Sequence, residues 1–215
     1  MLKETAIHEI DILIERYPCL ECLRVELLQS VAVMKDTCLR EGKLLICGNG
    51  GRAADSLHIV GELMKSFVVK RTIPQNLANK IALEFPEDAT FYLENLQGAI
   101  PALSLVNEVS LLTAFSNDKT AELSFAQQVL GYGKAGDVLI AISTSGNSKN
   151  VLHAAKVAKC IGLHIISMTG QNAGKLQALS DISLAVPSDI TYQIQELHLP
   201  IYHTLCLALE SELFS

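Results

Sequence analysis

The chain has 215 residues, a length typical of one α/β domain, and 49% of them are hydrophobic while 19% are charged. Its net charge of −6 would repel a phosphate backbone, and no run of Lys or Arg compensates for it, so we expect no nucleic acid partner. No uncharged stretch reaches the roughly 18 to 20 apolar residues of a membrane helix, and the N-terminus lacks a signal-peptide core. We therefore expect a cytoplasmic protein with no membrane partner.

The six cysteines predict neither disulfides nor a zinc ribbon. Most of them lie in apolar segments, where a reduced thiol behaves as a small hydrophobic group. Cys19 and Cys22 form a C-x-x-C, but a zinc ribbon needs a second such pair, which is absent. We interpret this pair as a coincidence at the start of a helix.

The order of the predicted elements indicates a doubly wound α/β domain over residues 1–215. Residues 1–41 form a helical arm of two helices, because apolar residues recur every three or four positions on both sides of Tyr17-Pro18. Short apolar runs then alternate with helical patterns, which predicts a five-stranded parallel sheet covered on both faces. The predicted strands are Lys43 to Cys47, Ala102 to Leu105, Asp137 to Ile142, His164 to Met168 and Ile182 to Val186.

Two segments depart from this regular alternation. Residues 66–100 contain two prolines and an acidic cluster, and we expect them to form an insertion over the edge of the sheet that carries the site, with short helices at Leu77-Ala78 and Phe91 to Leu96. The last apolar helical pattern runs from about Asp189 to Leu213. Pro200 interrupts it and should kink the helix or begin a new segment.

Gly-rich or Ser-rich turns follow three of the predicted strands, at 48–51, 143–148 and 169–170. In an open α/β sheet, ligands bind at the carboxyl ends of the strands, so these turns mark the expected site. The turn STSGNS combines several hydroxyl groups, a glycine and the start of a helix, which suits a phosphate. An ordinary capped turn is the alternative, and no Walker loop is present.

Two predicted helices carry polar groups that could act in chemistry. His58 and Glu62 are four residues apart, so they share one helix face, although a surface pair would look the same. Gln195 and His203 lie within about 80° of one another on the last helix. A buried, hydrogen-bonded histidine is the alternative for His198 or His203.

In order along the chain, these motifs resemble those of the SIS family, and within it the phosphoheptose isomerases. The resemblance is carried by the helical arm, GNGG followed by D-x-x-H-x-x-x-E, SND at 116–118, GDVLIAISTSGNS, and Q-x-x-H-x-x-x-x-H near the end. It implies a flavodoxin-like SIS fold and a homotetramer whose sites lie at subunit interfaces. It also implies an aldose–ketose isomerase that acts on a phosphorylated sugar, with sedoheptulose 7-phosphate as the leading substrate.

The resemblance also implies a role for each matching residue. Glu62 would be the catalytic base and His203 the acid, and these two with His58 and Gln195 would bind a divalent metal, zinc, with one ion per subunit. The sugar phosphate would contact Glu62, Gln195 and a further set of residues. That set consists of Asn49, Gly50, Gly51, Asn117, Asp118, Ser143, Thr144, Ser145 and Ser148.

Three departures from the family pattern accompany the resemblance. Arg52 stands where a small residue usually follows GNGG, Pro200 separates the two late histidines, and the interval from Glu62 to Pro101 is long. The alternatives are a non-catalytic sugar-phosphate regulator or replication-initiator partner, and an isomerase of a hexose or pentose phosphate. Retention of Glu62 and His203 favours an enzyme over the non-catalytic proteins, and the sequence leaves the length of the sugar open.

Overall fold

The computed structural model describes residues 1–215 and contains one five-stranded sheet. All neighbouring strands are parallel, in the order β2-β1-β3-β4-β5. The five predicted strands and the α/β class are confirmed. The strands are β1 (Leu44–Cys47), β2 (Ala102–Ser104), β3 (Val138–Ile142), β4 (His164–Gly170) and β5 (Ile182–Val186).

The strand order places a crevice between the carboxyl ends of β1 and β3. The chain passes outward from β1 to β2 and then returns to the other side of β1 as β3, which makes this point the topological switch of the sheet. The turn at 48–51 follows β1 and the turn at 143–148 follows β3. The order of the strands therefore brings the two predicted binding turns side by side.

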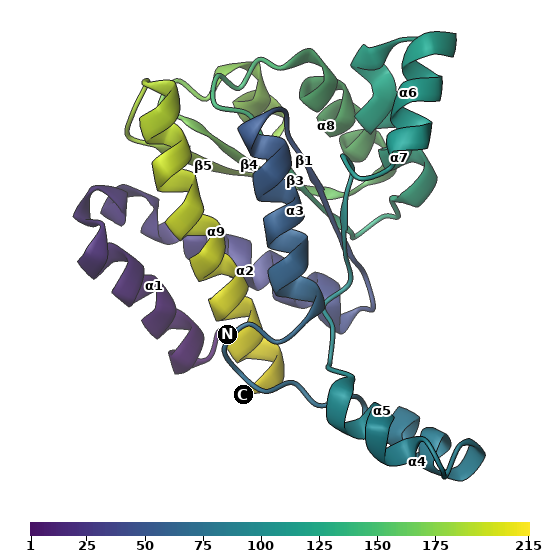
Figure 1. Ribbon diagram of the computed structural model, residues 1–215. Helices are drawn as coiled ribbons and strands as arrows, with labels where there is room; N and C mark the ends of the chain where they lie inside the picture. The colour runs from purple at the N-terminus through teal and green to yellow at the C-terminus, as the bar shows by residue number, and fades with distance from the viewer.

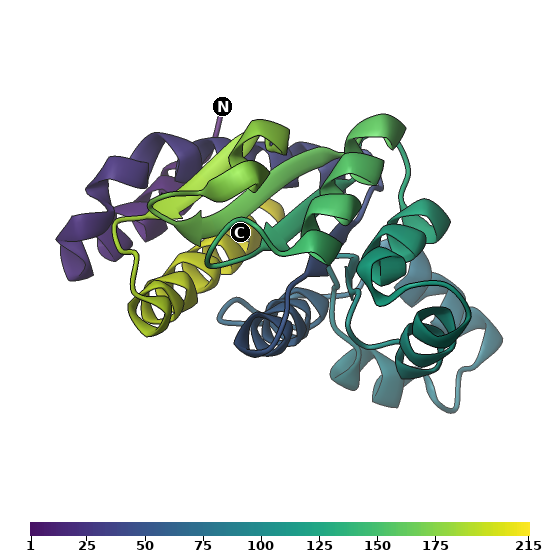
Figure 2. The same cartoon turned by 90° about the horizontal axis from the view of Figure 1, so that it is seen from above.

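Helices cover both faces of the sheet (Figures 1 and 2). α9 packs between α1, α2 and α3 on one face, while α7 and α8 cover the other. The helices are α1 (Glu4–Arg16), α2 (Arg24–Leu39), α3 (Gly51–Met64), α4 (Gln75–Glu84), α5 (Ala89–Asn95), α6 (Val109–Asp118), α7 (Ser124–Tyr132), α8 (Lys149–Ile161) and α9 (Thr191–Phe214), with short 3₁₀ turns η1 (Pro18–Leu23), η2 (Ala121–Leu123) and η3 (Gly174–Leu179).

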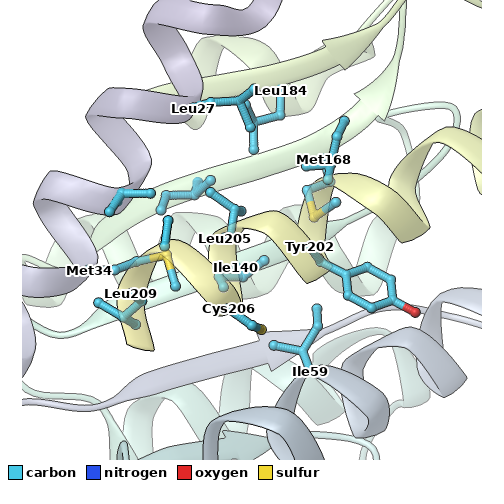
Figure 3. Packing of buried hydrophobic residues seen from close by; sticks show 14 of the residues in the cluster. Leu27, Met34, Ile59, Ile140, Met168, Leu184, Tyr202, Leu205, Cys206 and Leu209 are labelled. Atoms are coloured by element: carbon cyan, nitrogen blue, oxygen red, sulfur yellow. The ribbon is translucent and has the colours of Figure 1, made fainter. Parts of the chain in front are cut away.

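The core has two parts because successive strand residues point to opposite faces. Leu44 and Ile46 enter the larger cluster beneath α9, whereas Leu45 and Cys47 enter the smaller cluster beneath α8. Figure 3 shows the larger cluster, in which residues of α2, α3 and α9 meet side chains from β3, β4 and β5. Both faces of the central strands are therefore apolar, as the sequence pattern predicts for a covered parallel sheet.

Residues 1–41 are helical as predicted, and they belong to the main core. Ile10 of α1 and Leu27 and Met34 of α2 are fully buried in the larger cluster. Apart from the N-terminal methionine, Val25 and Leu39 are the large apolar residues of this segment that stay exposed. The apolar residues of the arm are thus mostly explained by folding of the chain itself.

The insertion at 66–100 forms a projecting hairpin of α4 and α5 (Figure 1). α3 begins at the carboxyl edge of the sheet and runs back along it, so the insertion leaves from the opposite edge. The expectation that it covers the carboxyl edge is wrong. The hairpin instead leaves the body close to the end of α3 that carries Glu62.

α9 is one continuous helix through Pro200, so the new segment that this proline suggested is not formed. Proline removes one backbone donor, but Ile201, Leu205 and Leu209 are buried against the core and hold the helix on course. None of the helices combines the length and apolar character needed to cross a bilayer.

Candidate active site

The turn after β3 forms a compact cup of hydroxyl groups. Ser143 is buried, and its Oγ lies 3.0 Å from the Oγ of Ser148, the residue that precedes α8. The side chain of Ser148 makes no capping bond to the helix, so its hydroxyl stays available. Ser145 is exposed and Thr144 is half-buried at the rim. The four predicted phosphate ligands are therefore together at the N-terminus of α8, where backbone N–H groups attract anions.

The cup packs tightly against the loop that follows β4 and is hydrogen-bonded to it. Gly146 has φ of +63°, and a Cβ at this position would lie 1.8 Å from the Ala173 carbonyl oxygen. The Leu176 N–H donates to the Gly146 carbonyl, and the Lys175 N–H donates to Asn147 Oδ1. Only glycine fits at 146, and two loops that are distant in sequence hold each other in place.

A pair of amides joins the cup to the turn after β1. Asn49 and Asn150 exchange hydrogen bonds of 2.8 and 2.9 Å between their side chains across the switch point. Gly50 adopts a φ of +58°, which glycine tolerates and which turns the chain into α3. Asn49 and Ser148 line one hollow of about 350 Å³, and Thr144 and Ser145 line a second of about 270 Å³. The carboxyl edge thus offers polar space for a phosphorylated ligand.

A second polar cluster lies farther along α3 and α9. His58 Nε2 is 3.2 Å from Glu62 Oε1, as their four-residue spacing on one helix face allows. The His58 and His203 rings pack edge to face with their centroids 5.0 Å apart. Phe67 also packs against His203, with 5.6 Å between ring centroids. His58, Glu62 and His203 therefore form one site, here called the Glu62 cluster.

The Glu62 carboxyl is held in its charged form. Burial alone would raise its pKa, but a 2.8 Å hydrogen bond from Lys65, the charge of Lys65 and the neighbouring His58 together lower it. Glu62 is thus a carboxylate at neutral pH, able to accept a proton.

His203 has the properties of an unsatisfied functional group. Its Nε2 atom is buried and has no hydrogen-bond partner. Burial, followed by the charge of His58, lowers its pKa below the usual range, while Glu62 opposes this effect. His203 is therefore neutral at pH 7 and has one ring nitrogen free, whereas a structural histidine would have both nitrogens bonded.

His198, five residues before His203 on α9, shows the contrasting structural pattern. It is fully buried, and burial lowers its pKa to about 4. Arg52 can only donate, so the Arg52 Nη1 contact of 3.0 Å requires His198 Nδ1 to accept, and His198 Nε2–H then donates to the Thr169 carbonyl at 3.2 Å. The alternative of a satisfied buried histidine thus applies to His198.

Arg52 also begins a polar chain that leads to the Glu62 cluster. Its guanidinium lies 2.7 Å from Asp55 Oδ2, and Asp55 interacts with the Tyr202 hydroxyl. The Tyr202 hydroxyl lies 3.0 Å from His58 Nδ1. Burial raises the pKa of Tyr202, so this hydroxyl keeps its proton. The large residue at position 52 is therefore accommodated by pointing inward and orienting the groups behind His58.

Three further predicted site residues belong neither to the Glu62 cluster nor to the cup. The Gln195 amide lies beside the turn after β1, 3.6 Å from where a Cβ on Gly51 would be. It is eight residues before His203 on α9, about 12 Å along the helix. Asn117 and Asp118 are exposed at the end of α6 and bond to each other at 3.0 Å. They contact none of the other predicted residues within this chain.

Comparison with known proteins identifies the family. The SIS domain family model matches residues 81–170, which include β2, β3, the cup and β4. The phosphoheptose isomerase of Helicobacter pylori strain P12 is 41% identical over 191 residues, which are 89% of this chain and 86% of the relative. That of Synechocystis is 42% identical over 173 residues, 80% of this chain and 76% of the relative. The chain belongs to the phosphoheptose isomerase family.

Solved structures of this family share the fold over nearly the whole chain. Phosphoheptose isomerase GmhA from Neisseria gonorrhoeae superimposes with a TM-score of 0.71 and 32% identity, and covers 96% of this chain and 93% of its own. A phosphoheptose isomerase from Francisella tularensis gives a TM-score of 0.75 at 29% identity, with 91% of each chain covered. The predicted SIS fold is therefore confirmed.

The four predicted metal ligands of this phosphoheptose isomerase family member do not converge on one point within a single chain. His58, Glu62 and His203 supply nitrogen and oxygen donors of the kind that zinc prefers, and His203 Nε2 has no partner. Gln195, however, lies about two turns away, and no group of three or more His, Cys, Asp or Glu side chains is arranged to hold a metal ion. The single chain thus presents an incomplete donor set.

Sequence reasoning missed the residues that support the Glu62 cluster. Tyr202 and Phe67 contact its two histidines, yet both read as ordinary apolar positions in the sequence. Asp55 could have been identified from the sequence, because it opens the D-x-x-H-x-x-x-E motif and lies one turn before His58. Arg52 could also have been identified, since it departs from the family pattern directly after GNGG.

Proposed function

We propose that this chain is a phosphoheptose isomerase, which interconverts sedoheptulose 7-phosphate and D-glycero-D-manno-heptose 7-phosphate. The observation that carries the proposal is the Glu62 cluster, which pairs an ionised carboxylate with an unpartnered imidazole nitrogen. The cup supplies the second requirement, a place for the phosphate. The relatives of known name supply the third, since phosphoheptose isomerases match the chain over most of its length.

The cup would bind the phosphate without a cationic side chain of its own. Hydroxyl groups of Ser143, Thr144, Ser145 and Ser148 donate to phosphate oxygens, and the N-terminus of α8 contributes its partial positive charge. The hydrogen bonds fix one end of the sugar. The remaining carbons then extend out of the cup.

Glu62 would take the proton from the carbon next to the carbonyl. The carboxylate is ionised at neutral pH, and its Oε1 faces His58 while its Oε2 faces Lys65. Removal of the proton leaves an enediolate, and its negative charge is stabilised by nearby donors. Return of the proton to the neighbouring carbon completes the conversion of ketose to aldose.

His203 would move the second proton between the two oxygen atoms. Its lowered pKa keeps the ring neutral, so one nitrogen can accept while the other donates. Tyr202 contacts His58 Nδ1 and Glu62 contacts its Nε2, so His58 is fixed beside the base, where it would contact a sugar hydroxyl or the enediolate oxygen. The two histidines and Glu62 together provide the acid and the base that the isomerisation needs.

We propose further that each site is completed by a second copy of the chain in a homotetramer. Gly51 and Glu62 are eleven residues apart on α3, about 16 Å along its axis. An extended seven-carbon phosphate is only about 10 Å long at roughly 1.2 Å per bond. Exposed apolar residues, Leu57 and Met64 of α3 and Leu199 of α9, border the Glu62 cluster and suit a subunit contact.

A zinc ion remains a proposal of the same kind. The donors of His58, Glu62 and His203 are chemically suitable, and the fourth ligand would have to come from a rearranged Gln195 or from another subunit. When bound, zinc would act as a Lewis acid that polarises the carbonyl. We also propose that the protein acts in the cytoplasm, where its six free cysteines would stay reduced.

The test is turnover and proton exchange on a panel of ketose phosphates with seven, six and five carbons. We expect the parent protein to convert the heptose phosphate, and Glu62→Gln to lose at least about 100-fold in turnover and in exchange of solvent deuterium into the sugar. Glu84→Gln, on the exposed face of the hairpin, is the matched control.

Each contrary result points to one alternative. Conversion of a hexose or pentose phosphate without the heptose would change the substrate. Tight binding with no exchange on any sugar would favour a sugar-phosphate regulator. A Glu62→Gln protein that exchanges at the parental rate would remove Glu62 from the mechanism.

A further inference from the structure

Arg71 is a buried cation at the base of the α4–α5 hairpin, and none of the sequence motifs explains it. Its side chain is almost completely buried, and its Nε donates to Glu210 Oε1 of α9 at 2.6 Å. Its Nη1 donates to the Leu63 carbonyl at 2.6 Å, and its Nη2 donates to the Glu62 carbonyl at 3.1 Å. One guanidinium therefore holds the backbone of the proposed catalytic base.

The position of these carbonyls explains why a cation is placed here. Leu63 and Glu62 belong to the last turn of α3, where carbonyl groups lack partners within the helix and carry the negative end of its dipole. Arg71 bonds to both from outside. It thereby caps the C-terminal end of α3 and fixes the turn on which the Glu62 side chain is mounted.

Glu210 extends the same contact to the loop that follows α3. It is fully buried and accepts hydrogen bonds from the N–H groups of three successive residues, Phe67, Val68 and Val69, at 2.8 to 3.0 Å. This arrangement places the Phe67 ring against His203. The Arg71–Glu210 pair thus supports both the proposed base and the proposed acid.

The pair also joins the hairpin to this end of the site. The Gly98 N–H, on the returning side of the hairpin, donates to the Arg71 carbonyl at 3.2 Å. A Cβ at Gly98 would lie 2.8 Å from the Phe214 ring, over which the Arg71 guanidinium also stacks at 4.9 Å. Arg71 therefore connects both sides of the base of the hairpin to α9.

Stability alone does not account for such a pair. A buried ion pair can often be replaced by apolar residues of similar size without loss of stability, because two charges must leave water to form it. In this chain the pair lies where the Arg71 donors reach the backbone of Glu62.

We propose that Arg71 is a positioning residue that, together with Glu210, fixes Glu62 for proton transfer and connects the α4–α5 hairpin to the catalytic end of α3. This inference rests on the proposed function, in which Glu62 is the base. It predicts that loss of the guanidinium changes the rate of the chemical step more than it changes substrate binding.

The first experiment compares Arg71→Lys with the parent on the heptose phosphate. Lysine keeps the charge but cannot donate to Glu210 and two carbonyls in one plane. We expect kcat and deuterium exchange to fall at least about tenfold with KM within about threefold, since small displacements of a catalytic group are costly. A kcat within about twofold of the parent, with only the melting temperature reduced, would overturn the proposal.

Two further variants, each at a buried carboxylate of α9, test the proposal even if Arg71→Lys fails to fold. Glu210→Gln removes the carboxylate that organises the loop, whereas Glu212→Gln removes a buried carboxylate on the same helix that bonds to Lys35 at 2.6 Å and not to α3. We expect both to lower the melting temperature, and only Glu210→Gln to lower kcat. Equal losses of kcat in the two variants would refute a positioning role.

The parent protein separates this inference from the proposed function. If the parent does not turn over the heptose phosphate, the proposed function fails and the role of Arg71 fails with it. If the parent is active while Arg71→Lys and Glu210→Gln keep its kcat, only the positioning role is lost.

Discussion

Acidification should destabilise the fold through His198. Burial lowers the pKa of this imidazole to about 4, whereas the unfolded chain has the ordinary value of 6.5. Between these values the unfolded state binds a proton that the folded state rejects, so stability falls as the pH drops below 6.5. Above pH 6.5 both states are neutral at this residue, and its contribution is constant.

The size of the effect follows from the shift in pKa. A difference of 2.5 units, from 6.5 to about 4, corresponds to about 3 kcal/mol at 1.36 kcal/mol per unit. The main physical cause is burial, which disfavours the charged ring, and the Arg52 guanidinium, which already donates to His198 Nδ1, adds a repulsion between two positive groups. The cost is thus a matter of burial first and of the neighbouring guanidinium second.

Urea unfolding of the parent and of His198→Gln, at one fixed protein concentration, measures this effect at each pH from 7.5 to 4. Glutamine cannot titrate, so the free energy of unfolding of the parent should fall by about 3 kcal/mol more than that of the variant over this range. His8→Gln, an exposed change on α1, should follow the parent. A constant difference between parent and His198→Gln would show that His198 is not a neutral buried group, and would refute the assigned hydrogen bonds.

The other predictions concern ligand binding and catalysis. Replacing Ser145 and Ser148 by Ala should raise KM at least about tenfold with a smaller change in kcat, because each bond to a charged phosphate is worth about 1.5 to 3 kcal/mol. Unchanged affinity in calorimetry would mean that the phosphate binds elsewhere. Tyr202→Phe should lower kcat about threefold to tenfold with little change in KM, since a hydrogen bond to His58 worth about 1 kcal/mol is lost. Parental kinetics would show that His58 is oriented without the Tyr202 hydroxyl. If zinc is bound, elemental analysis should find it in the parent and not in His203→Ala, and equal zinc in both would exclude His203 as a ligand.

The sequence predicted the sheet and the cup well because both depend on local signals. Runs such as Val138 to Ile142 are apolar at every position, and the turn after them has the one glycine that its conformation requires. A strand followed by such a turn and a helix allows few arrangements. The four cup hydroxyls therefore come together in the fold as their spacing suggests.

The Glu62 cluster was only partly predictable, since it depends on how α9 packs on α3. The contact of His58 with His203 joins residues far apart in the chain, and the family resemblance rather than the spacing indicated it. Tyr202 and Arg71 carry no sequence signal, because their roles arise from burial beside groups on other elements. The position of the α4–α5 hairpin could not be predicted for a similar reason. Its composition shows that the segment is irregular, but it does not show from which end of α3 the segment projects.

The interlock between Gly146 and the loop at 170–174 has a thermodynamic consequence. Each loop excludes a side chain from the other and supplies its hydrogen-bond partners, so the cup is already in shape before any ligand arrives. A preorganised receptor loses little conformational entropy on binding, and the phosphate group can therefore contribute nearly its full interaction energy whatever sugar it is attached to. Discrimination among sugars must then come from the groups that contact the rest of the sugar, outside the cup.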